Sequence, residues 1–309
     1  MKIDKIPQDP LKADSDFTGE FKGAFNIRSN GQCAGRQSTD NIKIESKKDA
    51  PGLEIHIKPG TKGETVYIPA CVTQGGIDDL VYNDFFVGEN ADVIIVAGCG
   101  VHNTEDTEAR HNGIHRFFMG KSSHVLYKEK HLGTGDEKAG GVRRIDPVTD
   151  CILEEDSTLE MDTVQLGGVD ATKRLTTAVL GARSKLLVRE RLLTDGDETA
   201  ESSFIVTVNG EDAGVDLISR SVAKGNSKQS FHSNIQGRCR CTGHSECDAI
   251  LADNGVVIAT PALEAAHVDA ALIHEAAIGK IAGEQLLKLC TLGLTPEEAE
   301  KKIIEGFLK

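Results

Sequence analysis

The sequence predicts an all-β core, a parallel β-helix of stacked short strands, followed by a C-terminal helical hairpin. Alternating or β-branched runs recur about every ten residues between Leu53 and Leu263, each closed by Gly, Asn or Asp. Almost no helical period separates them, which excludes a doubly wound α/β sheet with its crossover helices. The 309 residues include 32 glycines and only 4% aromatics, which favours stacked coils, although a sandwich or barrel stays an alternative.

The elements follow in three expected parts. Residues 1–50 are polar and predict an irregular N-terminal segment. Residues 51–265 predict the β-helix core, because period-2 alternation with turn residues is typical of strands. The expected strands include "LEIHI" at 53, "ADVIIVAG" at 91, "SSHVLY" at 122, "LEMDTVQLGG" at 159, "KLLVRERLL" at 185, "SSFIVTV" at 202 and "GVVIA" at 255.

Residues 266–309 predict a helical subdomain. The Ala-rich stretch 269–293 places most of its apolar residues at helical offsets. Gly293 suits the C′ position after such a helix. A second helix is expected to begin with Thr295 as N-cap, Pro296 at N1 and Glu298 completing a capping box. We therefore expect two helices joined by a short turn.

Charge and cysteine content limit the partners and the compartment. The formal net charge of −13 argues against nucleic acid or an anionic membrane as the main partner. The first residues lack the apolar region of a secretory signal, and no apolar stretch approaches a membrane span. We expect a cytoplasmic protein, in which the eight cysteines are free thiols, metal ligands or nucleophiles rather than disulfides.

Three familiar catalytic motifs are absent or incomplete. No phosphate-binding loop of the G-x-x-x-x-G-K-[ST] type occurs, so any ATP hydrolysis must belong to another chain. The "HEAAI" at 274 has Ile278 where a zinc protease needs its second histidine. The "HSE" at 244 is not followed by the P-C-x-x-C of zinc deaminases.

The run "GRCRCTGHSECD" at 237–248 contains three cysteines and one histidine. The C-x-C spacing of Cys239 and Cys241 suits one tetrahedral ion poorly, and we interpret both as small strand-face thiols that pack in the β-coil. Cys247 is expected to differ, because the polar residues around it predict an accessible turn. A histidine nearby would favour its thiolate.

Further potential ligands lie downstream of Cys247. Glu264 follows Pro261 closely, and His274 and Glu275 open the expected hairpin. Each alone would be an ordinary surface residue. Together they supply one thiolate, one imidazole and two carboxylates within 29 residues, a mixed set that iron accepts.

At these residues the chain resembles the C-terminal core of the SufB/SufD family, the scaffold proteins of the SUF iron–sulfur cluster assembly system. The similar elements, in order, are "ECDAIL", "TPALEA", "IHEAAIGKIAGEQLLKLCTLG" and "LTPEEAEKKIIEGF". The resemblance covers residues 50–309 and is strongest from 230 onward. It implies a right-handed β-helix and a minimal, SufB-like member that forms a homodimer, or a heterodimer with a paralogue.

The resemblance also implies roles for single residues. Cys247 would be the thiolate on which sulfur and iron assemble, with His274 and Glu275 as further functional ligands and Glu264 as an oxygen ligand or proton carrier. The product would be a transient iron–sulfur cluster, built from a sulfur donor's sulfur and passed to apo-proteins. The C-terminal helices would dock a SufC-like ABC ATPase.

The leading hypothesis is therefore a cluster assembly scaffold that is not itself an enzyme. Mixed Cys, His and carboxylate ligation across a dimer interface would hold a cluster loosely enough for release. Two alternatives stay open: a structural β-solenoid without metal, and a β-helix enzyme that acts on carbohydrate. Neither alternative requires a thiol at Cys247, so that residue discriminates between them and the scaffold.

Overall fold

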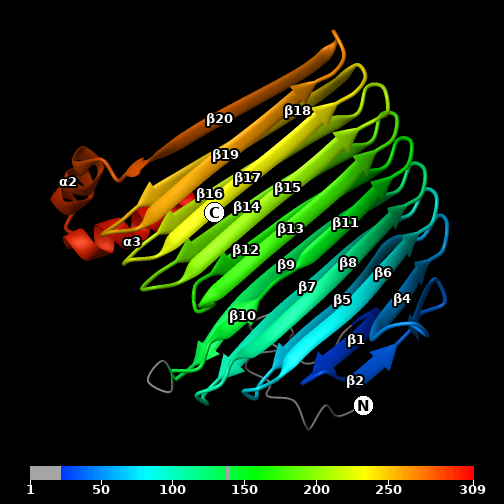
Figure 1. The fold of residues 1–309 in the computed structure, drawn as a ribbon, viewed down its shortest axis with the longest axis horizontal. Coiled ribbons are helices and arrows are strands. Elements are labelled where there is room, and N and C mark those ends of the chain that lie inside the picture. Colours follow the sequence, from blue (N-terminus) through cyan, green and yellow to red (C-terminus); the bar gives the residue numbers. More distant parts are fainter. Residues whose placement is uncertain (1–21, 137–139) are drawn as a thin grey trace.

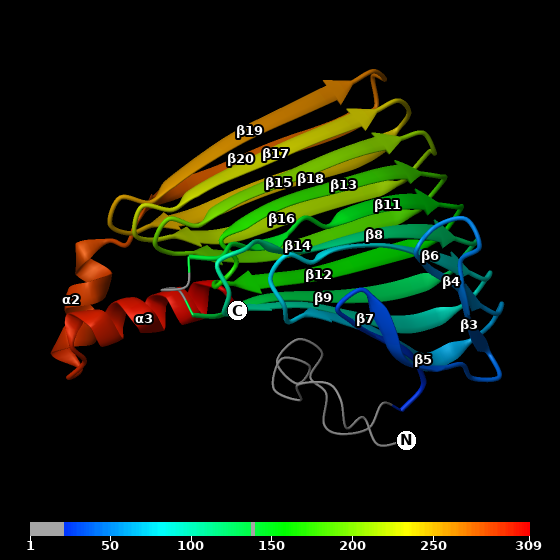
Figure 2. The same ribbon diagram turned by 60° about the horizontal axis from the view of Figure 1, so that its bottom comes forward.

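The computed structural model describes residues 22–136 and 140–309 and shows a parallel β-solenoid of about eight turns with two C-terminal helices. Two sheets of ten strands form its faces (Figures 1 and 2). Sheet A runs in the spatial order β2 (Gln32–Gln37), β1 (Ala24–Ser29), β5 (Lys62–Val72), β7 (Asp92–Asn103), β9 (His124–Gly135), β12 (Thr158–Leu166), β14 (Lys185–Thr194), β16 (Gly214–Ala223), β18 (Cys241–Leu251) and β20 (Ala270–Lys280). Sheet B runs in the order β19 (Val256–Ala265), β17 (Lys228–Gly237), β15 (Thr199–Val208), β13 (Ala171–Leu180), β10 (Arg143–Ile145) with β11 (Val148–Leu153), β8 (Ala109–Met119), β6 (Asp78–Val87), β4 (Gly52–Ile57) and β3 (Ile42–Ser46). The predicted parallel β-helix is confirmed.

Each turn of the solenoid places its strands directly over those of the turn before. Lys185 pairs with Gly214, Gly214 with Thr242 and Cys241 with Ala270, so a turn in this half takes 28 or 29 residues. The pairing is parallel throughout except at the N-terminal end, where β1–β2 and β3–β4 are antiparallel. Such stacking repeats the shape of each turn rather than its residue types, which explains why the sequence shows no strict repeat motif.

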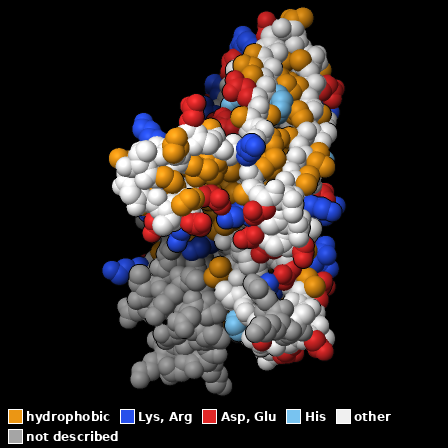
Figure 3. Space-filling model, turned by 90° about the vertical axis from the view of Figure 1, so that its left-hand side faces the viewer, with side chains coloured by type: hydrophobic (Ala, Val, Ile, Leu, Met, Phe, Trp, Pro, Cys, Tyr) orange, Lys and Arg blue, Asp and Glu red, His pale blue; other side chains and the backbone are white. Residues whose placement is uncertain are grey.

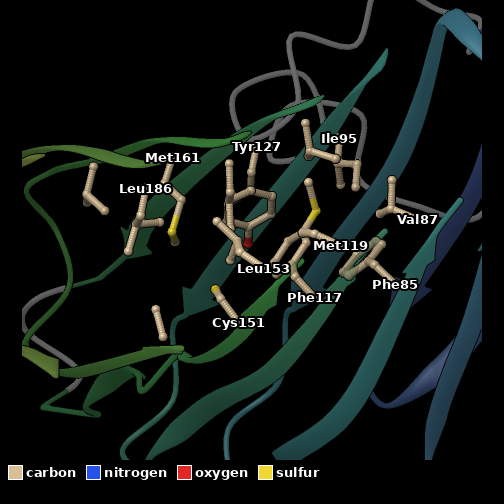
Figure 4. Close-up of a cluster of buried hydrophobic side chains, with 14 of the residues drawn as sticks. Phe85, Val87, Ile95, Phe117, Met119, Tyr127, Cys151, Leu153, Met161 and Leu186 are labelled. Carbon is tan, nitrogen blue, oxygen red and sulfur yellow. The ribbon is translucent and has the colours of Figure 1, made fainter. Parts of the chain in front are cut away.

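The core lies between the two sheets and is filled by the inward half of every strand. Alternation gives patterns such as the one of β14, in which every second side chain is buried. Most of the core is aliphatic. Three of its aromatic rings gather in one place, where Phe85 stacks on Phe117 at 4.7 Å and Phe117 contacts Tyr127 at 5.1 Å (Figure 4). Phe204 and Phe231 form a second contact farther along.

Cys241 belongs to a column of small side chains at the corner where each strand of sheet A begins. The column has one member per turn, and all are buried: Thr61, Ala91, Ser123, Ser157, Ser184, Ala213 and Cys241. Cys241, 3% exposed, therefore packs as predicted. Cys239 does not share a strand with it, because β17 ends at Gly237 and β18 begins at Cys241. Its thiol is half-buried and packs against the core, so the expected strand position is wrong for Cys239, but its expected packing is confirmed.

Two segments differ from the prediction. Residues 24–46, expected to be irregular, form β1, β2 and β3, which close the N-terminal end of the solenoid; residues 1–21 lie outside the described residues. Residues 270–280, expected to begin a helix, form β20, which pairs with β18 along its whole length. The Ala-rich composition favours a helix. However, the free edge of β18 can pair with eleven residues of this segment, and this pairing overrides the helical propensity.

The helical part begins after β20. Helix α2 spans Gly283–Thr291 and α3 spans Pro296–Phe307, and the predicted capping box of Thr295 and Glu298 is present. Gly293 follows the first helix with a φ of 98°. The C-terminal end of α3 packs Ile304 and Leu308 against Val222 on the outer face of sheet A. Helix α2 buries no residue, and it lies beyond the ends of the strands (Figure 2).

Candidate metal centre at the open end of the solenoid

Cys247 lies in the middle of β18 and points into the solenoid, where it is 1% exposed. The expectation of an accessible thiol in a polar turn is wrong. His244, Glu246 and Asp248, which suggested the turn, form the outward half of the strand, whereas Ser245 and Cys247 form the inward half.

The surroundings of Cys247 keep its thiol protonated. Burial raises its pKa to about 12, and the carboxylates of Glu190 and Asp248 act in the same direction. Ser219 is its neighbour on β16 and donates to Glu190 at 2.8 Å, while Ser202 donates to the same carboxylate at 2.6 Å. The thiol is therefore the favoured form at neutral pH, and a bound metal ion would favour the thiolate by replacing the proton.

His274 shares the inward face with Cys247, one turn farther along. It lies on β20 beside Ser245, and its Nδ1–H donates to the Ser245 carbonyl oxygen at 3.0 Å. This contact leaves the Nε2 lone pair available, the arrangement usual for a histidine that binds a metal. The strand neighbour of Cys247 on β20 is Ala276, two residues beyond His274.

Glu275 faces outward and joins a different group. Its carboxylate, the carboxylate of Glu246 and a ring nitrogen of His244 all lie within 4.8 Å of one another on the outer face of sheet A. Asp216 accepts from His244 Nδ1–H at 2.8 Å, so His244 keeps Nε2 for a ligand. Burial and the neighbouring Asp248 raise the pKa of Glu246, as expected for crowded carboxylates.

Glu264 lies on the other sheet. On β19 it pairs with Gln236, an outward-facing residue of β17, and its side chain is exposed. Within one chain, strand alternation therefore brings Cys247 and His274 to the interior and distributes Glu275 and Glu264 to the two outer faces. Sequence spacing could not show which of these residues face inward and which face outward, because 270–280 was expected to be a helix.

All four residues lie in the last two turns, at the open end of the solenoid. β19 and β20 are the terminal strands of their sheets, and among the described residues no strand pairs with their outer edges. Inward side chains that would be buried in an inner turn are exposed here, Leu263 to 38% and Ile278 to 40%. Figure 3 looks onto the side of the molecule that carries the helices and shows hydrophobic side chains at its surface.

A second group of potential ligands lies deep in the core and was missed by the sequence analysis. Ligand atoms of Cys99, Glu129 and His131 lie within 4.8 Å of one another, and all three residues are buried. Burial alone would raise the pKa of Glu129, but Arg174, at 2.6 Å, and His131 hold it well below its usual range. The alternation of "YKEKH" at 127–131, which puts Glu129 and His131 on the inward face, was the available signal.

Comparison with known proteins identifies the class. Residues 83–307 match the family model described as "SUF system FeS cluster assembly, SufBD core domain". The match covers most of the chain, and the chain belongs to this family, whose role is in iron–sulfur cluster assembly.

Similar curated proteins carry the same family description. An "Iron-sulfur cluster assembly SufBD family protein" of Methanothermobacter thermautotrophicus is 27% identical over 269 residues, covering 85% of this chain and 64% of the relative. One from Archaeoglobus fulgidus is 27% identical, covering 86% of this chain and 70% of the relative. One from Methanocaldococcus jannaschii is 23% identical, covering 88% of this chain and 86% of the relative. The chain thus spans slightly less than two thirds of the Methanothermobacter protein.

Proposed function

We propose that this chain is a scaffold on which a nascent iron–sulfur cluster is built and from which it is passed to apo-proteins. The observation that carries the proposal is the position of Cys247 and His274, which share the inward face of the last two turns in a chain of the SufBD family. Sulfide from a sulfur donor and iron are the materials that these residues would hold. The family match favours this role over a purely structural solenoid or a carbohydrate-active enzyme.

Cys247 would be the first ligand. As iron or sulfide arrives, a metal ion replaces the thiol proton, because a thiolate bound to metal no longer needs the solvation that burial denies it. His274 Nε2 would supply a nitrogen ligand from the neighbouring turn. With so few protein ligands on one chain, the cluster would be held weakly and could be released.

Glu275 and Glu264 would act on the outer faces. Glu275, with His244 and Glu246, offers two carboxylates and one imidazole, a ligand set suited to ferrous iron before it joins sulfide at Cys247. Glu264, exposed on the terminal strand β19, would serve as an oxygen ligand or proton carrier toward a facing chain.

A second copy of the chain, or a paralogue, would cover the open end. Unpaired strand edges and exposed apolar side chains are features that proteins normally cover. In such a dimer the ligands of two chains would face each other across the interface.

A SufC-like ABC ATPase would dock on the C-terminal helices. Helix α2 leaves Leu287 65% exposed, and the residue after it, Leu292, is 75% exposed. Because α3 is anchored on sheet A, movement of the docked ATPase would act on the last turns and open the interface. ATP hydrolysis would belong to that partner.

Cluster transfer tests the function as a whole. The chain is reconstituted anaerobically with iron and sulfide, separated from free ions, and mixed with an apo-ferredoxin. We expect a visible sulfide-to-iron absorption band on the chain, and faster gain of holo-ferredoxin than with equal amounts of free iron and sulfide. A chain that gains no band, or transfers no faster than the free ions, would contradict the scaffold.

A further inference from the structure

The outer face of sheet A carries a groove of about 440 Å³ that the proposed function does not use. It adjoins the His244–Glu246–Glu275 group, because Ile218 in its lining pairs with Glu246 on β18. Strands β9, β12, β14 and β16 form its floor, and Lys309, after α3, contributes to its wall. This volume lies within the usual range of small-molecule sites. The groove is lined by five cations: Lys128, Arg189, Arg191, Arg220 and Lys309.

The concentration of positive charge is unusual for this chain, whose net charge is −13. Only two outward-facing carboxylates, Glu160 and Asp162, line the groove, since Glu190 points to the interior. Both already have partners: Glu160 lies 3.0 Å from His124, and Asp162 pairs with Arg191. The remaining cations are therefore not neutralised by these carboxylates.

Two of the cations, Lys128 and Arg189, make no hydrogen bond or ion pair with any residue in the part of the chain that the structure describes. Arg220 makes no side-chain hydrogen bond there either, but it lies beside Asp248 on β18 and its charge acts on the Glu246 carboxylate. Strand register orders them across the groove: Lys128 lies beside Asp162, Asp162 beside Arg189, and Arg191 on the same strand beside Arg220. The span from β9 to β16 is three strand spacings, roughly 14 Å. An anion with several charges would contact more than one of them.

An apolar strip adjoins these cations. Leu126 and Leu187 flank Glu160 in one row of the sheet, and Ile218 lies beside Arg189 in the next. All three side chains line the groove and are half-buried. A purely inorganic anion would leave this strip unused, whereas the ring or chain of an organic molecule would cover it.

We propose that this groove binds a small organic molecule that bears a phosphate or diphosphate group. The guanidinium groups of Arg189 and Arg220 would bind phosphate oxygens through paired hydrogen bonds, for which arginine geometry is suited. Lys128 would add a third positive charge, and the organic part would lie on Leu126, Leu187 and Ile218.

Calorimetry with ADP as the probe tests the site on the purified chain without iron or sulfide, so its outcome is independent of cluster assembly. We expect ADP to bind more tightly than adenosine or pyrophosphate. R189Q and R220Q should each weaken ADP binding about tenfold, the effect of one lost charge-assisted hydrogen bond. The matched control is K185Q, which removes an exposed cation from the same strand outside the groove and should leave ADP binding unchanged.

Three results would overturn the proposal. Equal affinities for ADP and adenosine would show that the cations do not bind phosphate. Equal affinities for ADP and pyrophosphate would show that the apolar strip contributes nothing. Binding of a poly-glutamate peptide but not of ADP would assign the groove to an acidic protein segment instead. Because the exchanged side chains are exposed, circular dichroism should show all variants folded like the parent chain.

Discussion

Among single residues, Cys247 shows how strand alternation decides reactivity. Cys33 and Cys247 are both free thiols, but Cys33 is exposed, whereas Cys247 is buried and burial raises its pKa to about 12. The Cys247 thiol, although its sequence neighbours are polar, is therefore expected to be unreactive until this end of the solenoid opens or a metal ion binds.

Alkylation should reveal this difference. In the native chain at neutral pH, iodoacetamide should modify Cys33 rapidly and Cys247 slowly, because the reagent needs an accessible thiolate. In urea both should react alike. Mass spectrometry of peptides taken at timed intervals measures both rates; rapid native labelling of Cys247 would show that its thiol is accessible in the free chain.

The raised pKa also predicts a pH dependence of stability. Between pH 9, the ordinary value for a thiol, and about 12, the unfolded chain loses the Cys247 proton while the native chain keeps it. The unfolded state then binds fewer protons, so the free energy of unfolding falls as pH rises through this window. Urea titrations should show a shallower fall in C247A; equal slopes would mean that the native thiol titrates normally.

The buried pair of Arg174 and Glu129 should be a strong stability determinant. R174M leaves the Glu129 carboxylate uncompensated in the core and should lower the free energy of unfolding by about 3–5 kcal/mol. The double variant E129Q/R174M should recover part of this loss, because Glu129 then carries no charge, while Glu190, which also pairs with Arg174, keeps its hydrogen bonds from Ser202 and Ser219. Urea unfolding measures both; a double variant no more stable than R174M would mean that the charge itself is not the cause.

At the scale of elements, sequence patterns predicted the features that depend on neighbouring residues alone, such as helix ends. The capping box of α3 depends on Thr295 and Glu298, three residues apart, and Gly293 marks the preceding helix end; both were predictable. β20 was not predictable, because the Ala-rich stretch 270–280 favours a helix by composition and only its pairing with β18 makes it a strand. That error concealed the inward position of His274 and the outward position of Glu275. β1–β3 were missed because these strands are short and rich in polar residues, although β1 and β2, like β3 and β4, pair as neighbouring antiparallel strands.

The C-terminal helices give a prediction for the ATPase partner. L287E and L292E should abolish co-purification with a SufC-like ATPase while leaving the fold intact, since both side chains are largely exposed. I304E, in contrast, should detach α3 from sheet A and lower stability, because Ile304 packs on Val222. Undiminished co-purification of the L287E/L292E chain would place the docking surface elsewhere.

At the scale of the whole molecule, the solenoid is a stack with one open end. Its fold class could be predicted from strand spacing, glycine content and scarce aromatics. What the open end can bind could not, because it depends on which side chains the last turn leaves exposed. The described part of the chain contains no helix long and apolar enough to cross a membrane. The open end at β19 and β20 is proposed as a surface for protein association because it has unpaired strand edges among the described residues and exposed apolar side chains.

Light scattering tests that association. The wild-type chain should have the molar mass of a dimer. I278D should have the molar mass of a monomer, because it places a charge on the inward face of the open end. The matched control is I205D, at a similarly exposed position on the outer face of sheet B, which should remain a dimer. A wild-type monomer at all concentrations would argue for a heterodimer with a paralogue.

The most direct test of the central claim compares two buried thiols after anaerobic reconstitution with iron and sulfide. Cys151 is buried like Cys247, at 2% exposure, and burial raises its pKa as well, but it lies in the middle of the solenoid. C247A should lose most of the visible sulfide-to-iron band, whereas C151A, which creates a comparable cavity, should keep it. A C247A chain that gains the band as fully as the wild type would contradict cluster assembly on Cys247.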